Sequence, residues 1–264
     1  MNSEFPAMSQ DLRYMNLRRE GGTATIELDH PPLNVLHIPM LQELDAVLAG
    51  LSSDPELKLL VLTATGKAFC AGVDVADHTA ERVEFMIETF HSAIGRLLRF
   101  NAPVVGALNG AALGGGCELA LACDVILASS RAKLGQPEIK LGVFPPVAAA
   151  LLPRLVGRQR ALDLILSGRV LRASEARDIG LVSQVAEPEK FDELVANYVA
   201  ELASLSLPVL RLTKRAVVDG LDLPATEALA GAERHYLDDL MKLDDAREGL
   251  AAFLEKREPV WRDA

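Results

Sequence analysis

The chain has 264 residues, half of them hydrophobic and 24% charged, with a formal net charge of −10 and a pI near 5.1. This length accommodates one large domain, or one domain with a small appendage. The acidic balance argues against a general nucleic-acid-binding surface. Because no run of about eighteen apolar residues occurs, we expect no membrane span.

The cysteine count is low and odd, with Cys70, Cys117 and Cys123 only. No Cys-x-x-Cys spacing occurs, so the sequence predicts neither a disulfide framework nor a metal site, and a reducing cytoplasm is the expected compartment. The N-terminus lacks the basic-then-apolar layout of a signal peptide. Residues 2–7 resemble a cloning remnant, and we take Met8 as the native start.

The first half of the chain alternates between predicted strands and helices. In chain order we expect strands at 13–18 and 23–29, a loop at Asn34–Leu36, a helix at 38–50, a strand at 57–64, a helix at 82–99, a strand at 103–108, a short helix after three glycines, a strand at 124–128 and an extended piece at Lys133–Gly135. The helix at 82–99 carries its apolar residues near helical spacing. Such alternation implies right-handed parallel crossovers.

Beyond residue 148 the patterns that favour strands nearly vanish. Helices are expected at 148–155, 158–166, 173–178, 188–203, 206–219, 224–238 and 243–255. The alanine-rich composition of this region favours helix over disorder. The sequence therefore predicts an α/β fold with a core at 8–205 and an all-helical C-terminal segment at 206–264.

The most informative motif is a glycine triplet, Gly114-Gly115-Gly116, which follows a β-branched apolar run and precedes Glu118 by two residues. Glycines at a strand-to-helix junction let a ligand approach the backbone, and the free N–H groups there favour negative charge. A glutamate in the first helical turn can act on whatever those groups hold. Taken alone, the triplet is more typical of a tight turn, with the glutamate complementing the helix dipole.

Three other segments accompany the triplet. They are Pro31–Asn34, the run Gly66–Asp74 after a predicted strand, and the run Gly135–Pro145, which contains Gly-Gln-Pro-Glu-Ile. In this order, from about Leu12 to the end, the blocks resemble the crotonase superfamily, also called the enoyl-CoA hydratase/isomerase family. The resemblance implies a crotonase-like ββα spiral core. It also implies that the C-terminal helices cover a neighbouring subunit's site in a homotrimer or dimer of trimers.

The resemblance also implies a chemistry. Backbone N–H groups of Val73 and Gly115 would stabilise the thioester oxygen of an enolate-like state, as an oxyanion hole does. Glu118 matches the glutamate that activates water, and Glu138 matches the one that supplies the α proton. Two carboxylates held close together cannot both ionise easily, so one pKa rises.

Retention of both glutamates favours an enoyl-CoA hydratase, a hydro-lyase, over the alternatives on the same scaffold. An enoyl-CoA isomerase or a decarboxylase is the runner-up, since isomerases of this family often work with one carboxylate. A non-enzymatic RNA-binding member is a third reading, which the acidic charge and the lack of a Lys/Arg-rich helix disfavour. Glu138 has a bland alternative too, as part of a surface Pro-Glu turn.

Further positions match those that line the acyl-CoA channel of the family, and coenzyme A enters with the substrate, so no separate cofactor is expected. These positions are Leu33, Val35, Lys67, Ala68, Ala71, Gly72, Asp74, Val75, Leu113, Gly114, Pro137, Gly142 and Pro146. Lys214 and Arg215 in the tail either reach phosphates or form a solvated helix face. For His78 and His91 we expect solvent-facing or packing roles.

One departure from the family pattern concerns the stretch after Glu138, where Pro146 stands at a position usually held by glycine. Proline has no N–H to offer water or a carboxylate, and Val147 adds bulk. With the run from Ala71 to His78, this stretch resembles the subgroup that hydrates cyclohexadiene-carbonyl-CoA, which suggests a cyclic or conjugated acyl group. The alternative is that Pro146 only stiffens a loop.

Overall fold

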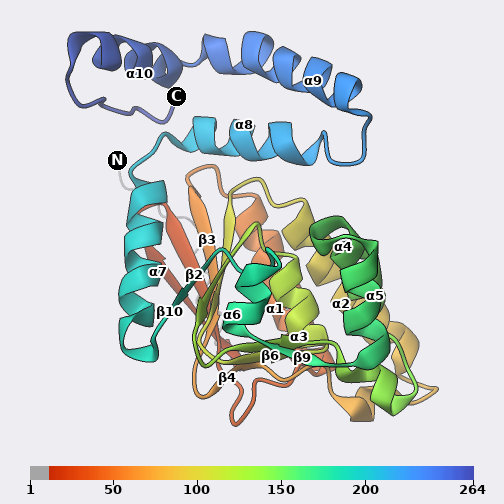
Figure 1. The fold of residues 1–264 in the computed structure, drawn as a ribbon. Helices are drawn as coiled ribbons and strands as arrows, with labels where there is room; N and C mark the ends of the chain where they lie inside the picture. The colour runs from red at the N-terminus through yellow and green to blue at the C-terminus, as the bar shows by residue number, and fades with distance from the viewer. Residues whose placement is uncertain (1–11) are drawn as a thin grey trace.

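The computed structural model describes residues 12–264, so the proposed start at Met8 and the segment 2–7 lie outside the described residues. The larger of two sheets has the order β1-β2-β3-β5-β7-β10 (Figure 1). Its strands are β1 (Met15–Glu20), β2 (Thr23–Leu28), β3 (Leu59–Ala64), β5 (Val104–Leu108), β7 (Val125–Ser129) and β10 (Gln184–Ala186). Only the β1–β2 pair is antiparallel, which confirms the predicted parallel core.

The smaller sheet has the order β4-β6-β8-β9 and carries the glycine-rich segments. Its strands are β4 (Ala68–Cys70), β6 (Ala111–Leu113), β8 (Lys133–Gly135) and β9 (Val170–Arg172). Only β8 was expected from the sequence, and the prediction that strands nearly end at residue 148 misses β9 and β10. Each missed strand has three residues, too few for a recognisable alternation of side chains.

Helices cover both faces of the larger sheet. Alternate residues of β3 point to opposite faces, so Leu60 and Leu62 join the main core, whereas Leu59 and Val61 pack under Phe191. The helices of the core are α1 (Ile38–Ser52), α2 (Val83–Leu98), α3 (Gly115–Leu121), α4 (Pro146–Val156), α5 (Arg158–Ser167), α6 (Ala173–Asp178) and α7 (Pro188–Ala203). Short 3-10 segments lie at Val75–Asp77 and Pro137–Leu141.

Three further helices cross above the core in Figure 1: α8 (Leu207–Val218), α9 (Ala225–Arg234) and α10 (Asp244–Glu255). The sequence predicts a single helix at 224–238. In the structure, α9 ends at Arg234 and is followed by a π-helical turn at His235–Asp239 and a 3-10 turn at Leu240–Lys242. His235 lies between two carboxylates there, with ring nitrogens 3.1 Å from oxygens of Asp219 and Asp239.

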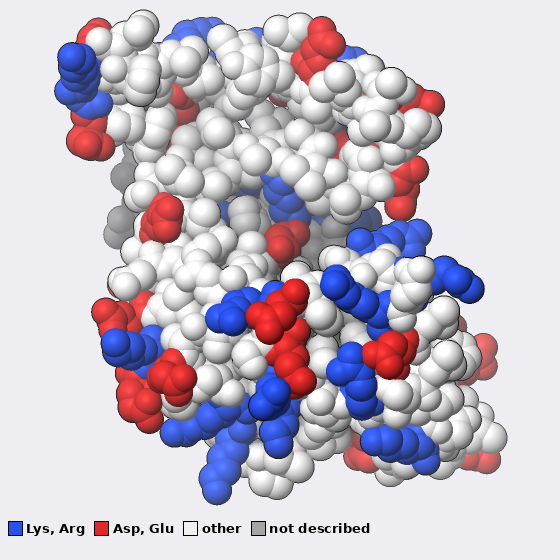
Figure 2. Space-filling model, in the orientation of Figure 1, with Lys and Arg blue, Asp and Glu red and all other residues white. Residues whose placement is uncertain are grey.

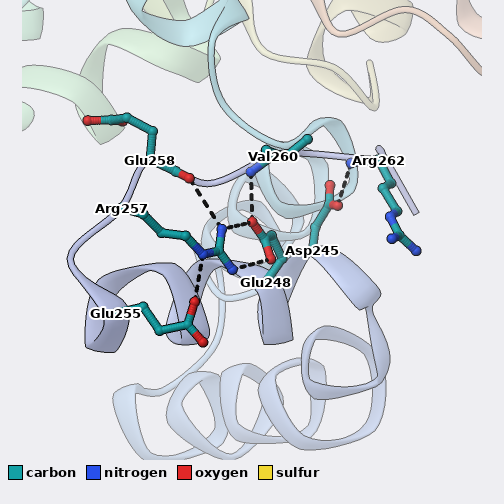
Figure 3. Close-up of polar contacts among 7 residues, drawn as sticks. All are labelled: Asp245, Glu248, Glu255, Arg257, Glu258, Val260 and Arg262. Carbon is teal, nitrogen blue, oxygen red and sulfur yellow. Dashed lines mark hydrogen bonds and ion pairs between the residues drawn. The ribbon is translucent and has the colours of Figure 1, made fainter.

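The last residues form a strap, which we define as residues 256–264, that folds back along α10 (Figure 3). The guanidinium of Arg257 contacts both oxygens of Glu248 at 2.6 and 2.9 Å, and it lowers the pKa of that carboxyl to about 2. Buried Asp245 accepts the N–H groups of Arg262 at 2.7 Å and Asp263 at 3.0 Å. Asp245 of α10 therefore satisfies two backbone donors of the strap that would otherwise lack partners.

The surface carries both signs of charge, and Figure 2 shows a hollow between the C-terminal helices and the core on this face. A cavity of about 400 Å³ between the end of α2 and α8 is lined by residues that include Arg99, Arg211 and Lys214.

Among the described residues, no single helix is long and apolar enough to cross a membrane. The pair α7 and α8, bent by 101°, meets that test by length and composition only.

Candidate active site

Two backbone N–H groups meet where β4 leaves the smaller sheet and α3 begins. A Cβ added to Gly72 would lie 3.9 Å from the nitrogen of Gly115, and one added to Gly115 would lie 3.3 Å from the nitrogen of Val73. Leu36 pairs with this segment, because its N–H donates to Gly72 at 2.9 Å and its carbonyl accepts from Asp74 at 2.8 Å.

The pairing with Leu36 turns the Val73 N–H away from that strand, as expected at a parallel bridge. The Gly115 N–H belongs to the first turn of α3, where backbone donors have no partner within the helix. Neither N–H donates to another described residue. The two donors are therefore available to a single acceptor, the arrangement an oxyanion hole needs.

Glu118 lies in the first turn of α3 and is 3% exposed. Its Oε1 accepts the N–H of Ala148 at 2.8 Å, so the carboxyl caps the N-terminus of α4. Burial, with a smaller contribution from the charge of Glu138, raises the pKa of Glu118 to about 7, although hydrogen bonds from the N–H groups of Ala148 and Val147 oppose the shift. The structure thus holds a carboxyl group that titrates near neutral pH.

Glu138 lies half-buried in the 3-10 segment that follows β8. A Cβ added to Gly114 would lie 2.7 Å from Glu138 Oε1, so only glycine fits there, and Gly114 adopts φ = +53°. Burial raises the pKa of Glu138, whereas nearby His78 lowers it. The Glu138 Oε2 atom is buried without a hydrogen-bond partner among the described residues.

Gly114 joins the two segments that carry the glutamates, because its carbonyl accepts the backbone N–H of Glu118 at 2.9 Å and its own N–H donates to the carbonyl of Gly135 at the end of β8. Two acid–base groups and two free donors therefore surround one turn. Such a set suits a reaction that takes one proton, gives another and develops negative charge on an oxygen between them.

The segment Pro31–Asn34, predicted to line the channel, lies directly beside this turn. Leu33 accepts the N–H of Ala71 at 3.0 Å, and buried Asn34 donates to the carbonyls of Thr65 and Ala68 at 3.0 and 2.9 Å. Asn34 has φ = +53°, a conformation that asparagine tolerates better than most residues. Leu33 and Val75 expose apolar side chains here.

The remaining predicted channel residues fall on three neighbouring segments. Lys67 precedes β4, Leu113 ends β6, and Pro137 begins the 3-10 segment that Gly142 ends in a left-handed conformation. Val35 contributes its carbonyl, 3.1 Å from a ring nitrogen of His30. Pro146 is the first residue of α4, two residues before the start predicted for that helix, so the alternative in which it stiffens a loop is wrong.

Two sequence expectations need correction. Lys214 is neither a free phosphate ligand nor part of a solvated face, because its side chain is only 9% exposed and pairs with Asp124 at 2.6 Å while donating to the Ala102 carbonyl. The pair fixes α8 to the core. Pro146 removes no donor from Glu118, because the N–H groups that serve this carboxyl belong to Ala148 and Val147.

His78 is exposed, as expected, yet its charge acts on Glu138 and its Nδ1 lies 3.0 Å from the Asp74 carbonyl. Burial raises the pKa of Cys70 and Cys117 to about 12, so both thiols beside the site stay protonated. Sequence reasoning missed the Ala148 donor and the role of Asn34. A proline at the first helical position is a recognised N-terminal signal that would have found the first.

Comparisons with known proteins identify the family. The sequence model of the family described as "Enoyl-CoA hydratase/isomerase" matches residues 18–264. A protein of Rhizobium meliloti (strain 1021), named "Probable enoyl-CoA hydratase", is 39% identical over 246 residues, which cover 92% of this chain and 95% of that protein. The chain belongs to the enoyl-CoA hydratase/isomerase family.

One further relative and one solved structure are also similar to this chain. The cyclohexa-1,5-dienecarbonyl-CoA hydratase of Thauera aromatica is 36% identical, covering 94% of this chain and 95% of that protein. The crystal structure of the enoyl-CoA hydratase from Bacillus anthracis superposes with a TM-score of 0.91 at 32% identity, covering 96% of this chain and all of that one. The fold is therefore that of the crotonase-like enzymes, as the sequence predicts.

Proposed function

We propose that this protein is an enoyl-CoA hydratase that adds water across the double bond of an α,β-unsaturated acyl-CoA thioester, with Glu118 and Glu138 as its acid–base pair. The observation that carries the proposal is the pair of glutamates at one turn, both with raised pKa values, beside two unpartnered N–H groups. The names of the relatives support hydration as the reaction. Water and the thioester are its two reactants.

The proposed reaction balances in one proton cycle. Ionised Glu118 takes a proton from water as the water oxygen bonds to the β carbon, and the electron pair of the double bond moves toward the thioester oxygen. The N–H groups of Val73 and Gly115 stabilise that oxygen. Protonated Glu138 then delivers its proton to the α carbon, and exchange with solvent restores both carboxyl groups. We expect no cofactor in these steps.

The finer proposal is that the acyl group is a cyclic dienoyl group. Its support is the Pro-Pro-Val-Ala stretch at 145–148 and the likeness to the Thauera aromatica hydratase. Pro146 and Val147 lie in the first turn of the helix that Glu118 caps, and the backbone N–H of Val147 contacts the carboxyl proposed to activate water. Added bulk there reshapes the space next to the β carbon.

A panel of three thioesters tests the function. Purified protein is offered crotonyl-CoA, a long-chain enoyl-CoA and a cyclic dienoyl-CoA, and hydration is followed as loss of absorbance of the conjugated thioester. We expect turnover of at least one, with the cyclic substrate preferred. Isomerisation without water addition would favour the isomerase alternative, and no reaction with any of the three would contradict the proposal.

A double change tests the cyclic preference. Pro146→Gly with Val147→Gly should raise the ratio of crotonyl-CoA turnover to cyclic dienoyl-CoA turnover by about tenfold, since altered pocket contacts shift selectivity by about 1–3 kcal/mol. The ratio is the readout because two glycines also loosen the first turn of α4 and lower every rate. An unchanged ratio would place substrate choice elsewhere.

We further propose that the protein works as a homotrimer or dimer of trimers through the C-terminal segment 206–264. Support comes from apolar side chains left exposed on α9, α10 and the connecting turns, among them Leu221, Leu229, Phe253 and Leu254. Such a surface is typical of a protein–protein interface.

The cytoplasm remains the proposed compartment, on the strength of the unpaired cysteines.

A further inference from the structure

Three aromatic rings form a cluster outside the proposed catalytic machinery. The imidazoles of His30 and His37 stack with ring centroids 4.7 Å apart and planes 9° from parallel. Tyr14 meets both rings edge-on, at centroid distances of 5.3 Å and 4.5 Å. The guanidinium of Arg13 covers the other side of the tyrosine at 5.4 Å. We call Tyr14, His30 and His37 the histidine stack.

The histidine stack brackets the segment that positions the oxyanion donor. His30 donates its backbone N–H to Asn34 at 2.8 Å, and its Nδ1 lies 3.1 Å from the Val35 carbonyl. The next residue, Leu36, makes both hydrogen bonds that align Val73. His37 follows at once and precedes α1. A movement of either imidazole would therefore shift Val35 or Leu36, and through Leu36 the position of the Val73 N–H.

One ring nitrogen of the stack is sensitive to protonation. The Nδ1 atom of His37 is buried and has no hydrogen-bond partner among the described residues. A neutral imidazole can leave that atom as a bare acceptor, whereas an imidazolium would place an unsatisfied N–H there. It would also place a positive charge against His30. Both effects disfavour the cation while the ring stays in the stack.

The charges around His37 come from several elements. Arg13 precedes β1, Asp74 and Asp77 belong to the 3-10 segment, and Glu43 of α1 accepts the N–H groups of Arg13 and Tyr14. Asp77 is occupied, since it pairs with Arg82 at 2.7 Å and accepts the Ile38 N–H. Burial lowers the pKa of His37, His30 lowers it further, and the two aspartates oppose this shift.

We propose that the histidine stack positions the segment 30–36 against Val73 and makes thioester binding acid-sensitive, with His37 as the residue whose protonation releases the segment. The inference rests on the proposed oxyanion hole and channel. The folded protein favours neutral His37, so affinity is complete above the ordinary histidine pKa and falls as pH drops below it.

A binding experiment separates His37 from catalytic Glu118, while Glu138 is present in every protein compared and so contributes to each. Butyryl-CoA, which has no double bond to hydrate, is titrated by calorimetry into protein that carries Glu118→Gln, so that Glu118 cannot contribute to the pH dependence. Affinity is compared at about pH 8 and about pH 5.5, a range that spans histidine titration. His37→Phe keeps a ring for stacking but cannot titrate. His91→Phe, at an exposed histidine of α2, is the matched control.

We expect the Glu118→Gln parent and the His91→Phe control to lose roughly tenfold in affinity on acidification, and His37→Phe to lose less than about threefold. Titration of the coenzyme A phosphates affects all three proteins equally. His30→Phe serves as a second variant, and we expect it to show the same small loss of affinity on acidification. An equal acid loss in parent and both stack variants, or none in the parent, would overturn the inference. Crotonyl-CoA hydration by protein with Glu118 intact tests the proposed function separately.

Discussion

At the scale of single residues, the site depends on glycines that keep two backbone donors together. Gly115 has no room for a side chain, because an added Cβ would lie 2.5 Å from Val73 Cγ2. The β-branched Val73 side chain packs where that Cβ would be. Gly114 disfavours a side chain for different reasons, its φ of +53° and the Glu138 carboxyl that an added Cβ would displace.

Gly115→Ala should therefore force the Val73 and Gly115 N–H groups apart and lower kcat by about 10²–10³, the usual loss when one oxyanion donor is removed. Steady-state hydration of the preferred thioester measures it. Gly231→Ala in α9 is the control, because its added Cβ would contact only the Arg234 guanidinium, at 3.8 Å. Retention of normal kcat in Gly115→Ala would remove Val73 and Gly115 from the mechanism.

Glu118 links catalysis to stability. Its pKa is raised from 4.5 to about 7, so the folded state holds a proton that the unfolded state releases between these values. Stability therefore falls as pH rises through this window. Glu118→Gln should raise the free energy of unfolding at about pH 8 by up to about 3 kcal/mol, and hardly at about pH 4.

Urea unfolding at both pH values checks this expectation. Glu84→Gln, at an exposed position of α2, removes the same charge from the surface and should change the free energy of unfolding little at either pH. An equal effect of the two substitutions at about pH 8 would mean that folding does not raise the pKa of Glu118.

At the scale of elements, long helices and buried strands follow from sequence patterns, whereas the smaller sheet does not. The helix at 82–99 and the strand at 103–108 carry enough periodic or continuous apolar residues to be recognised, and α2 and β5 lie there. Strands β4 and β6 exist because their three residues pair with each other across about forty positions of chain. The sequence of three residues alone does not indicate such a distant pairing.

The same distinction applies to the site. The glycine triplet, Glu118 and Glu138 were predicted as a group from blocks of sequence. The Leu36 pairing with Val73 is a contact between distant segments, so no local signal marks it. The proline that begins α4 marks the free N–H groups of that helix end, but not that Glu118, thirty residues earlier, accepts one of them. Lys214 was misjudged for this reason, since its partner Asp124 lies ninety residues earlier in the chain.

The strap at 256–264 gives an element-scale prediction. Asp245→Ala leaves the N–H groups of Arg262 and Asp263 without their acceptor, so the strap should detach from α10 and become a protease substrate. Limited proteolysis with mass spectrometry locates the cleavage. Asp244→Ala, which removes an exposed partner of Arg247, is the control. Equal resistance of both variants would show that Asp245 does not hold the strap.

At the scale of the whole molecule, the C-terminal helices leave apolar residues without a cover. Phe253 is 81% exposed and Leu254 is 80% exposed on α10. Burying two such side chains contributes about 1.5–3 kcal/mol each, enough to drive assembly when repeated on every subunit. The number three comes from the family, not from this surface.

Light scattering should therefore give a mass that is a multiple of three subunits at micromolar concentration. Phe253→Ser with Leu254→Ser should lower that mass toward one subunit. Leu166→Ser, on the exposed side of α5, removes a side chain of similar exposure outside the C-terminal segment and is the control. A monomeric wild-type protein, or a trimer that the double change leaves intact, would contradict assembly through this segment.

The central claim is that Glu118 and Glu138 together add water to an enoyl-CoA thioester. The most direct measurement compares wild type, Glu118→Gln and Glu138→Gln on the preferred thioester of the panel, with butyryl-CoA affinity measured in parallel. We predict that each substitution lowers kcat by at least about 10² and changes affinity by less than about threefold. Near-normal kcat in either variant would contradict the two-carboxylate mechanism.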